Sequence, residues 1–235
     1  MGISCCIIVK DEENYIENAL KSVKGLVDEI VVVDTGSKDK TIEIAKQSTD
    51  KIFNYEWNDD FSDARNFSLS KAGQEWILVL DADEIIAIED HQKIKDLTKL
   101  EGYYGFSFEQ LSYMNESDVY GFNPVLEKNN YTRDFTGYIS CNIVRLFRNM
   151  PEIYFDGAVH ESVDRSIKKL GNVMKTNIKI HHYQFEKGMN FQREKQLKYL
   201  KIYEENIDKY PNKARAYRDI GMTYYTFLNN YEKAF

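Results

Sequence analysis

The 235-residue sequence contains few cysteines, few prolines and no long apolar run. Two of the three cysteines, Cys5 and Cys6, are adjacent in an apolar stretch, and with Cys141 they form no CxxC pair. This argues against a cysteine-based metal site and predicts buried free thiols in a reducing cytoplasm. No apolar stretch reaches the roughly 18–20 residues of a membrane helix, and no signal peptide precedes the first predicted strand. We therefore predict a cytoplasmic protein without a membrane span.

The sequence also lacks an excess of positive charge, because its formal net charge is −7. This argues against broad nucleic-acid binding, which requires a basic face. An anionic substrate is still compatible, because a bound divalent metal reverses the local sign of the charge. A length of 235 residues with 43% hydrophobic residues predicts one large α/β domain with a small appendage.

Short apolar runs alternate with helical patterns in the first 90 residues. Gly25 ends the first helical pattern, and Ser62 is a candidate N-cap of a helix that reaches Ala72. Such alternation with short connections predicts a parallel sheet with right-handed crossovers. The predicted strands are residues 3–9, 29–34, 51–55 and a buried strand that starts at Trp76. The predicted helices are residues 15–23, a helix from about residue 39, residues 62–72 and residues 90–100.

The second half of the chain has a different pattern. Residues 103–163 are rich in aromatic and β-forming residues, which predicts strands of a mixed or antiparallel extension. The last predicted strand, residues 177–185, places His182 on one face with Ile178 and Ile180, and His181 on the other. The long polar loop 115–136, within the first of these two regions, is typical of a lid, a binding loop or a disordered segment.

Helical periodicity returns at the end of the chain. Residues 190–210 form one predicted helix with an apolar stripe, and Pro211 ends it. The next residues fit one tetratricopeptide repeat, although an ordinary helix pair has the same pattern. We predict domains at residues 1–188 and 189–235, and we expect the natural chain to continue as a repeat array. An apolar face left bare by a single repeat predicts a homodimer through these helices or a grip on a protein acceptor. The stripe consists of Leu197, Leu200, Tyr203, Ile207 and Tyr210, and the repeat pattern includes Tyr217, Ile220 and Tyr224.

Two carboxylates follow the predicted strand at Trp76. Ligands of open α/β sheets bind beyond the carboxyl ends of the strands, so Asp81 and Asp83 are predicted to lie at the binding edge. Carboxylate oxygens suit Mg²⁺ or Mn²⁺, and these metals bind substrate phosphates as well. The alternative is that both aspartates cap the following turn.

Other charged residues are predicted at the same edge. Asp34 ends the second predicted strand, where a carboxylate can accept a hydrogen bond from a nucleobase or a ribose, and Gly36 allows a close turn. Glu12 follows the first strand. Arg65 is a cation suited to a diphosphate on a helix whose start favours anions. The alternatives are a simple Asx turn for Asp34 and a solvated helix face for Arg65.

Four ordered motifs together are more specific than any one of them: IIVKDEENYI, VVVDTGSKDKT, WNDDFSDARN and LVLDADE. In this order the sequence resembles family 2 glycosyltransferases of the GT-A fold, closely over about 90 residues and more loosely through RLFRN, VHE and IHHY. The subgroup it resembles includes bacterial lipopolysaccharide-core glucosyltransferases and sublancin-type peptide S-glycosyltransferases, some with helical-repeat tails. The resemblance implies a Rossmann-like mixed sheet flanked by helices, followed by a short helical tail.

The resemblance also implies roles for particular residues. Asp83 and His182 would hold Mn²⁺ or Mg²⁺, although His182 also fits a diphosphate contact or a core histidine. The acidic catalytic pair of many relatives is absent, and His160-Glu161 stands in its place, so Glu161 is the candidate general base. Its alternative is a surface glutamate at a strand edge. The implied nucleotide and donor residues are Val9, Glu12, Asp34, Arg65, Asp81 and Ala82.

The predicted function is metal-dependent inverting transfer of a sugar from a nucleotide-diphosphate sugar, such as a UDP-hexose, to a protein, a peptide or a cell-surface glycan. A nucleotidyltransferase is one alternative, but such enzymes have a Gly-rich basic loop after the first strand, where this chain has Lys10-Asp11-Glu12. The other alternative is a non-catalytic nucleotide-binding scaffold for the repeat array.

Overall fold

The computed structural model describes residues 1–207, 210 and 213–234. They form one mixed sheet in the order β3-β2-β1-β4-β8-β6-β9-β5, with β7 paired to β8. The pairs β3–β2, β2–β1 and β1–β4 are parallel, and β4–β8, β8–β6 and β9–β5 are antiparallel. The bounds are β1 Ile3–Val9, β2 Glu29–Asp34, β3 Ile52–Asn54, β4 Trp76–Val79, β5 Glu84–Ile86, β6 Tyr103–Met114, β7 Asn123–Pro124, β8 Gly137–Arg148 and β9 Asn172–His182. The predicted parallel half is confirmed, and so is the mixed extension at β6 and β8. Residues 149–163 form only an isolated bridge instead of a predicted strand, and β9 spans residues 172–182 instead of 177–185.

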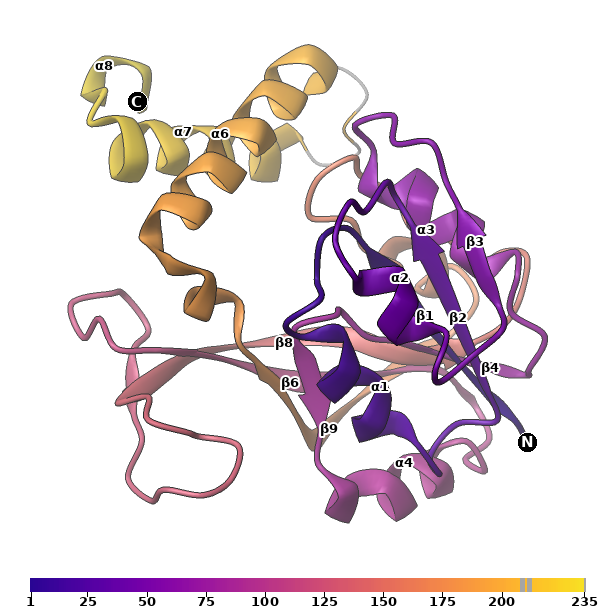
Figure 1. Ribbon diagram of the computed structural model, residues 1–235. Coiled ribbons are helices and arrows are strands. Elements are labelled where there is room, and N and C mark those ends of the chain that lie inside the picture. The colour runs from indigo at the N-terminus through magenta and orange to yellow at the C-terminus, as the bar shows by residue number, and fades with distance from the viewer. Residues whose placement is uncertain (208–209, 211–212, 235) are drawn as a thin grey trace.

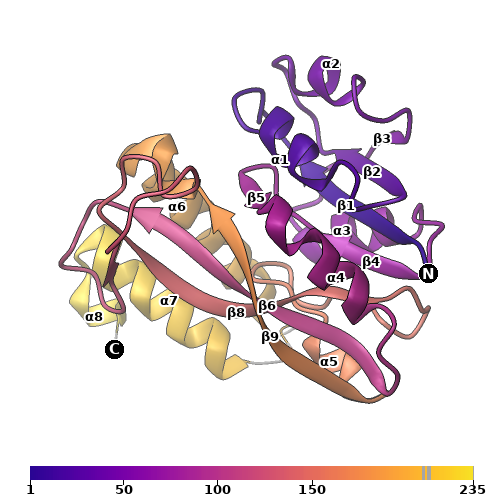
Figure 2. The ribbon, with the colours of Figure 1, turned by 90° about the horizontal axis from the view of Figure 1, so that it is seen from below.

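Helices cover both faces of this sheet (Figures 1 and 2). One apolar cluster joins α1, α2 and α4 to one face, and a second joins α3 and α5 to the other. The burial of Ile16, Ala19, Leu20 and Val23 on α1 follows the helical period that the sequence shows. The bounds are α1 Ile16–Val23, α2 Thr41–Ala45, α3 Phe61–Leu69, α4 His91–Leu97 and α5 Asp164–Ile167, with the 3₁₀ turns η1 Ile88–Asp90 and η2 Gln184–Lys187.

The strand β4 lies where the parallel half of the sheet meets its antiparallel extension, and all four of its residues are buried. It pairs with β1 on one side and with β8 on the other. Because both faces are covered by helices, the strand is continuously apolar, as predicted. Its direction carries Asp81 to the edge where β1 and β2 also end.

Several local predictions are wrong. The N-cap of α3 is Asp60, whose side chain accepts a hydrogen bond from the Asp63 amide, and Ser62 lies within the first turn. Asp60 accepts from the Ser62 hydroxyl as well, so the carboxylate takes the capping role. Cys5 and Cys6 are buried free thiols, but Cys141 is exposed, because it lies on a stretch of β8 where residues 140–142 are all exposed.

The C-terminal helices pack on the loop that contains Ala158 and Val159 (Figure 1). Ile202, Tyr203, Tyr210 and Ala216 form a cluster with Ala158 and Val159, and the Val159 amide donates to the Tyr210 hydroxyl oxygen at 2.9 Å. The predicted stripe is therefore largely buried against the chain's own loop. Its first member, Leu197, is 36% exposed, which corrects that part of the prediction. The bounds are α6 Gly188–Asn206, α7 Lys213–Leu228 and α8 Tyr231–Ala234.

The end of the tail contains one close helix contact. A Cβ atom on Gly221 of α7 would lie 2.7 Å from the backbone oxygen of Ala234 in α8. Only a glycine permits this approach. A helix hairpin with a small residue at the contact agrees with the predicted repeat unit, and the boundary between residues 188 and 189 stays a prediction.

The loop 115–136 is partly fixed to the sheet. Its short strand β7 pairs with the start of β8. The ring of Tyr131 stacks on His181 at 4.2 Å between centroids, and the Arg133 guanidinium lies 3.6 Å from the centroid of Tyr183. Residues 115–121 are exposed. The base of the loop is thus held in place while its tip faces solvent.

Candidate functional site

The carboxyl ends of β1 and β2 form the first wall of the candidate site. Val9 ends β1, and its carbonyl oxygen accepts from the Thr35 amide at 2.9 Å and from the Thr35 hydroxyl at 3.0 Å. Asp34 ends β2 and is only 8% exposed. One of its carboxylate oxygens accepts from the Ser37 amide at 2.9 Å, which is the geometry of an Asx turn. The turn and a nucleoside contact are compatible, since a carboxylate has two oxygens.

Glu12 lies beside this wall, and only one of its two carboxylate oxygens has a hydrogen-bond partner among the described residues. Its amide donates to the Thr41 hydroxyl oxygen at 2.7 Å, and its Oε1 accepts from the Lys187 ammonium at 2.6 Å. Its Oε2 is buried and has no hydrogen-bond partner among the described residues. Burial raises the pKa of Glu12 to about 7, against the opposing effect of Lys187. A buried acceptor without a partner at a predicted nucleoside pocket favours a ligand contact there.

Asp81 is held by two arginines. Its Oδ1 lies 2.6 Å from a terminal nitrogen of Arg65, and its Oδ2 lies 3.0 Å from a terminal nitrogen of Arg145. Burial alone would raise the pKa of Asp81, but the two guanidinium groups hold it well below the usual range. The neighbouring Ala82 is 5% exposed, so the turn that carries Asp81 is tightly packed. The predicted alternative of a simple turn cap is not what the structure shows for Asp81.

Asp83 and His182 face each other across the sheet edge. The Asp83 Oδ1 atom lies 3.4 Å from His182 Nε2, and the Ser112 hydroxyl lies 2.9 Å from His182 Nδ1. Although burial opposes both shifts, the pair lowers the pKa of Asp83 and raises that of His182. His181 points to the other face, where its Nδ1 lies 2.7 Å from the Tyr113 hydroxyl. The predicted alternation of the two histidines is confirmed.

These two residues fit one side of a divalent-metal site. Neighbouring ligands of an octahedral ion at 2.0–2.1 Å lie about 3 Å apart, close to the observed Asp83–His182 separation. Contact between His182 and Ser112 also fixes the ring, as partners of metal-binding histidines do. Within residues 1–207, 210 and 213–234, no group of three or more His, Cys, Asp or Glu residues is placed to hold a metal. The chain's two donors therefore fit an ion that takes its other ligands from a diphosphate and water.

Arg65 connects the candidate base to the sheet edge. It is 7% exposed, so the solvated-face alternative is wrong. Its Nε donates to Glu161 Oε1 while one terminal nitrogen donates to Asp81. Its other terminal nitrogen is buried without a hydrogen-bond partner in the described part of the chain. Glu161 is thus a partly buried carboxylate that shares Arg65 with Asp81. The alternative of a surface glutamate is wrong.

Sequence reasoning missed two cations of this site. Arg145 lies within the RLFRN motif and contacts Glu84 Oε1 at 2.6 Å as well as Asp81. Its motif was the available signal, but its pairing with Asp81 depends on the antiparallel contact of β8 with β4. Lys187 contacts both Glu12 and Asp83 from the residue before α6. No local sequence pattern marks it.

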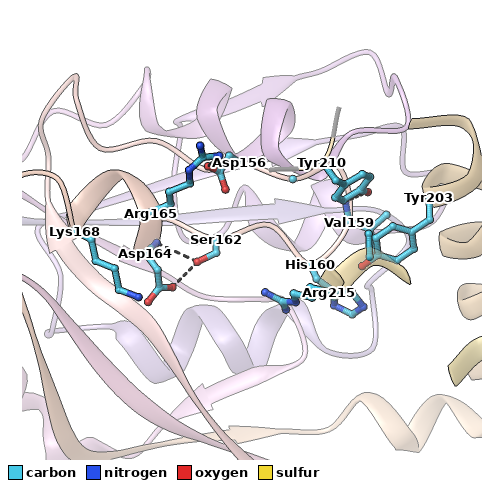
Figure 3. A pocket seen from close by; sticks show the side chains of 12 residues that line it. Asp156, Val159, His160, Ser162, Asp164, Arg165, Lys168, Tyr203, Tyr210 and Arg215 are labelled. Carbon is cyan, nitrogen blue, oxygen red and sulfur yellow. Dashed lines mark hydrogen bonds and ion pairs between the residues drawn. The ribbon is translucent and has the colours of Figure 1, made fainter. Parts of the chain in front are cut away.

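A cavity of about 290 Å³ lies between the loop around residue 160 and the C-terminal helices (Figure 3). His160 lines it and makes ring contacts with Tyr199 and Tyr203, while the next residue, Glu161, contacts Arg65. The two neighbours therefore face opposite sides of the loop. The cavity floor is buried, and its rim carries charges of both signs: the lining residues include Asp156, Val159, Asp164, Arg165, Lys168, Tyr203, Tyr210 and Arg215.

Residues 4–150 match the family model described as glycosyl transferase family 2. The chain belongs to this family. A TPR repeat-containing protein of Synechococcus elongatus is 36% identical over 169 residues, which cover 72% of this chain and 37% of that protein. The SPbeta prophage-derived glycosyltransferase SunS of Bacillus subtilis is 28% identical over 215 residues, which cover 91% of this chain and 47% of SunS. The chain thus spans less than half the length of these two relatives.

Solved structures of two proteins share the fold of this family 2 chain. TarS of S. aureus in complex with UDP-GlcNAc superposes with a TM-score of 0.52 at 18% identity, over 98% of this chain and 74% of that one. Glucosyl-3-phosphoglycerate synthase of Mycobacterium tuberculosis, in complex with Mn²⁺, UDP and glucosyl-3-phosphoglycerate, gives 0.55 at 14% identity, over 90% and 81%. The predicted GT-A architecture is confirmed. None of the helices in the described residues has the length and apolar character needed to cross a membrane.

Proposed function

We propose that this chain binds a UDP-sugar with Mn²⁺ or Mg²⁺ and transfers the sugar with inversion to an acceptor. The observation that carries this proposal is the meeting of Glu12, Asp34, Asp81 and Asp83 at one sheet edge, with buried cations between them. Acids that bind a nucleoside at one end and a metal at the other fit a nucleoside diphosphate that spans them. Fold neighbours crystallised with UDP-GlcNAc and with UDP and Mn²⁺ support the same donor class.

Each residue then has a part in donor binding. Asp34 accepts from the nucleobase, Glu12 faces the nucleoside, and the backbone at Val9 and Ala82 shapes the wall. Asp83 and His182 would hold the divalent ion, which would supply positive charge to the diphosphate leaving group. Arg65 donates to both Asp81 and Glu161 and so links the candidate base to the donor side.

Glu161 is the proposed general base. It takes the proton of the acceptor hydroxyl or thiol as the acceptor atom attacks the sugar carbon, and the bond from that carbon to the β-phosphate oxygen breaks to release UDP. One carboxylate suffices for such an inverting step. Arg65 orients Glu161 on the donor side by donating its Nε–H to the carboxylate.

The acceptor side is proposed to involve the helical tail. The cavity beside His160 lies on the other side of the loop that carries Glu161, and α6 and α7 form part of its wall. Large exposed apolar side chains, Tyr217, Met222 and Tyr225, lie on α7. We propose that this surface grips a protein or peptide acceptor or a second copy of the chain. Light scattering reports the assembly state, and a dimer would favour the second copy.

The experiment for the donor is a panel of nucleotide sugars incubated with Mn²⁺ and with chelator. Slow hydrolysis of one UDP-sugar to UDP, abolished by chelator, is the expected result. Release of pyrophosphate from a nucleoside triphosphate and a sugar phosphate would instead identify a nucleotidyltransferase. A protein that binds UDP but turns over no donor would match a scaffold.

A further inference from the structure

Lys187 occupies the gap between the two ends of the candidate donor site. Its ammonium nitrogen lies 2.6 Å from Glu12 Oε1 and 2.9 Å from Asp83 Oδ2. Glu12 belongs to the predicted nucleoside side and Asp83 to the predicted metal side. A diphosphate that joins a nucleoside to a metal-bound sugar phosphate must pass through this gap.

The backbone around Lys187 is fixed on both sides. The Tyr183 amide donates to the Asp83 carbonyl oxygen at 3.0 Å, just before the η2 turn that Lys187 ends. On the other side, Gln192 of α6 donates to the Gln184 carbonyl oxygen at 2.6 Å and is itself 5% exposed. The side chain is 13% exposed, so its position is set by buried neighbours rather than by a solvated surface.

Its surroundings favour a charged lysine. Besides the two carboxylates, the ammonium lies 5.1 Å from the ring centroid of Tyr15 and 5.3 Å from that of Phe191. An ammonium has three donors, and the two ion pairs engage two of them. The neighbouring Glu12 keeps a buried oxygen without a partner among the described residues, so the Lys187 contact leaves this part of the site incomplete. The unpaired oxygen of Glu12 beside the ammonium of Lys187 indicates that a polar ligand binds there.

We propose that Lys187 is a donor-binding residue that contacts the diphosphate of the nucleotide, exchanging part of its contact with Asp83 for a phosphate oxygen. This rests on the proposed function and adds a residue to it. The exchange frees Asp83 Oδ2. Before the nucleotide binds, the ammonium at Asp83 Oδ2 repels a divalent ion at Asp83 Oδ1, so the lysine and the ion compete for the charge of this carboxylate. Because Gly188, at a φ of 81°, starts α6 directly after Lys187, the same contact ties the helical tail to the donor.

Calorimetry with UDP and with uridine, each in the presence of Mn²⁺, tests the inference. In Lys187→Met, UDP affinity is expected to fall about 10- to 100-fold, the range for loss of a charged hydrogen bond, while uridine affinity stays within about twofold. Lys187→Arg should recover most of the UDP affinity. Lys201→Met, on the exposed side of α6, is the matched control and should bind both ligands as the parent does.

A second readout uses Mn²⁺ without nucleotide. Removing the competing ammonium should tighten Mn²⁺ binding by Lys187→Met, although the same variant binds UDP more weakly. Opposite signs in the two titrations are specific to the proposed exchange. Equal losses of UDP and uridine affinity, or UDP affinity unchanged from the parent, would overturn it. A parent protein that binds no UDP at all would instead overturn the proposed function.

Discussion

Residues 1–90 and residues 145–187 contribute opposite charges to the same site. The first region provides the acids Glu12, Asp34, Asp81 and Asp83 at the ends of β1, β2 and β4. The second provides the cations Arg145 and Lys187, from β8 and the end of η2, and the imidazole of His182 on β9. Arg65 is the exception, a cation from the first region that reaches Glu161 in the second.

This difference shows how the two halves depend on each other. The acids follow parallel strands, so their meeting is a consequence of sheet direction. Side chains of the antiparallel extension and of α3 lie against Asp81 and Asp83 and hold the pKa of both carboxyl groups below the usual range, whereas burial raises the pKa of Glu12. In the proposed donor site, the first region thus provides the acids and the second provides most of the basic side chains that face them.

The largest expected effect concerns the contact between the two regions at Glu161. Glu161→Gln keeps an oxygen that accepts from Arg65 and removes the proton acceptor. Sugar transfer should fall by about 10²–10⁴-fold with UDP affinity retained, the usual range for loss of a general base. Glu152→Gln, an exposed residue, is the control. Full turnover by Glu161→Gln would move the role of base to another carboxylate, such as Asp156.

The second-largest expected effect is a loss of folding stability when Arg65, the cation that contacts both regions, is replaced. Arg65→Met leaves Asp81 and Glu161 without their shared partner. Breaking a buried pair by removing one member costs about 3–5 kcal/mol, and we expect the free energy of unfolding in urea to fall by that order. Arg193→Met, at an exposed position of α6, should leave it unchanged. A loss below about 1 kcal/mol would mean that the network contributes little to the fold.

A smaller effect is expected at the acid wall alone. Asp34→Asn keeps the oxygen that accepts from Ser37 and removes the charge. UDP affinity should fall about 10- to 100-fold, as for loss of a charged hydrogen bond. The measurement is an equilibrium titration of each variant with UDP. Asp50→Asn, at an exposed position in the same half of the chain, is the control. If both variants bind UDP as the parent does, the nucleoside pocket lies elsewhere.

The smallest expected effect is a pH dependence at Glu12. Burial raises its pKa to about 7, above the ordinary value near 4.5, so the folded chain binds its proton more tightly than the unfolded chain. This contribution to stability is fully present below about pH 4.5 and is lost as the pH rises to about 7. Urea unfolding of the parent across this window should therefore show a falling component that Glu12→Gln lacks. Parallel pH profiles for both proteins would contradict the raised pKa.

Sequence patterns anticipated the acids better than the cations. Asp34 and Asp81 follow apolar runs, and the direction of a buried strand is enough to place them. Lys187 and Arg145 reach the site through pairings of residues far apart in the chain, such as Glu84 with His182 and Leu78 with Leu146. No periodicity encodes such contacts. The same holds for β5, which is three residues long and pairs with the distant β9.

Local errors have the same physical origin. Ser62 and Asp60 are both good N-cap residues, and the structure selects Asp60 because the helix begins one residue earlier, at Phe61. Leu197 fits the helical stripe, but the loop at Val159 covers only the later members. In both cases the local preference was correct in kind, and tertiary contacts decided the position.

The central claim is that Asp83 joins a divalent ion to a UDP donor. Calorimetry of UDP binding with Mn²⁺ and with chelator tests it, using the parent, Asp83→Asn and the exposed control Asp96→Asn. The account predicts Mn²⁺-dependent UDP binding by the parent and the control, and no gain from Mn²⁺ in Asp83→Asn at an unchanged melting temperature. Equal stimulation by Mn²⁺ in all three proteins would contradict it.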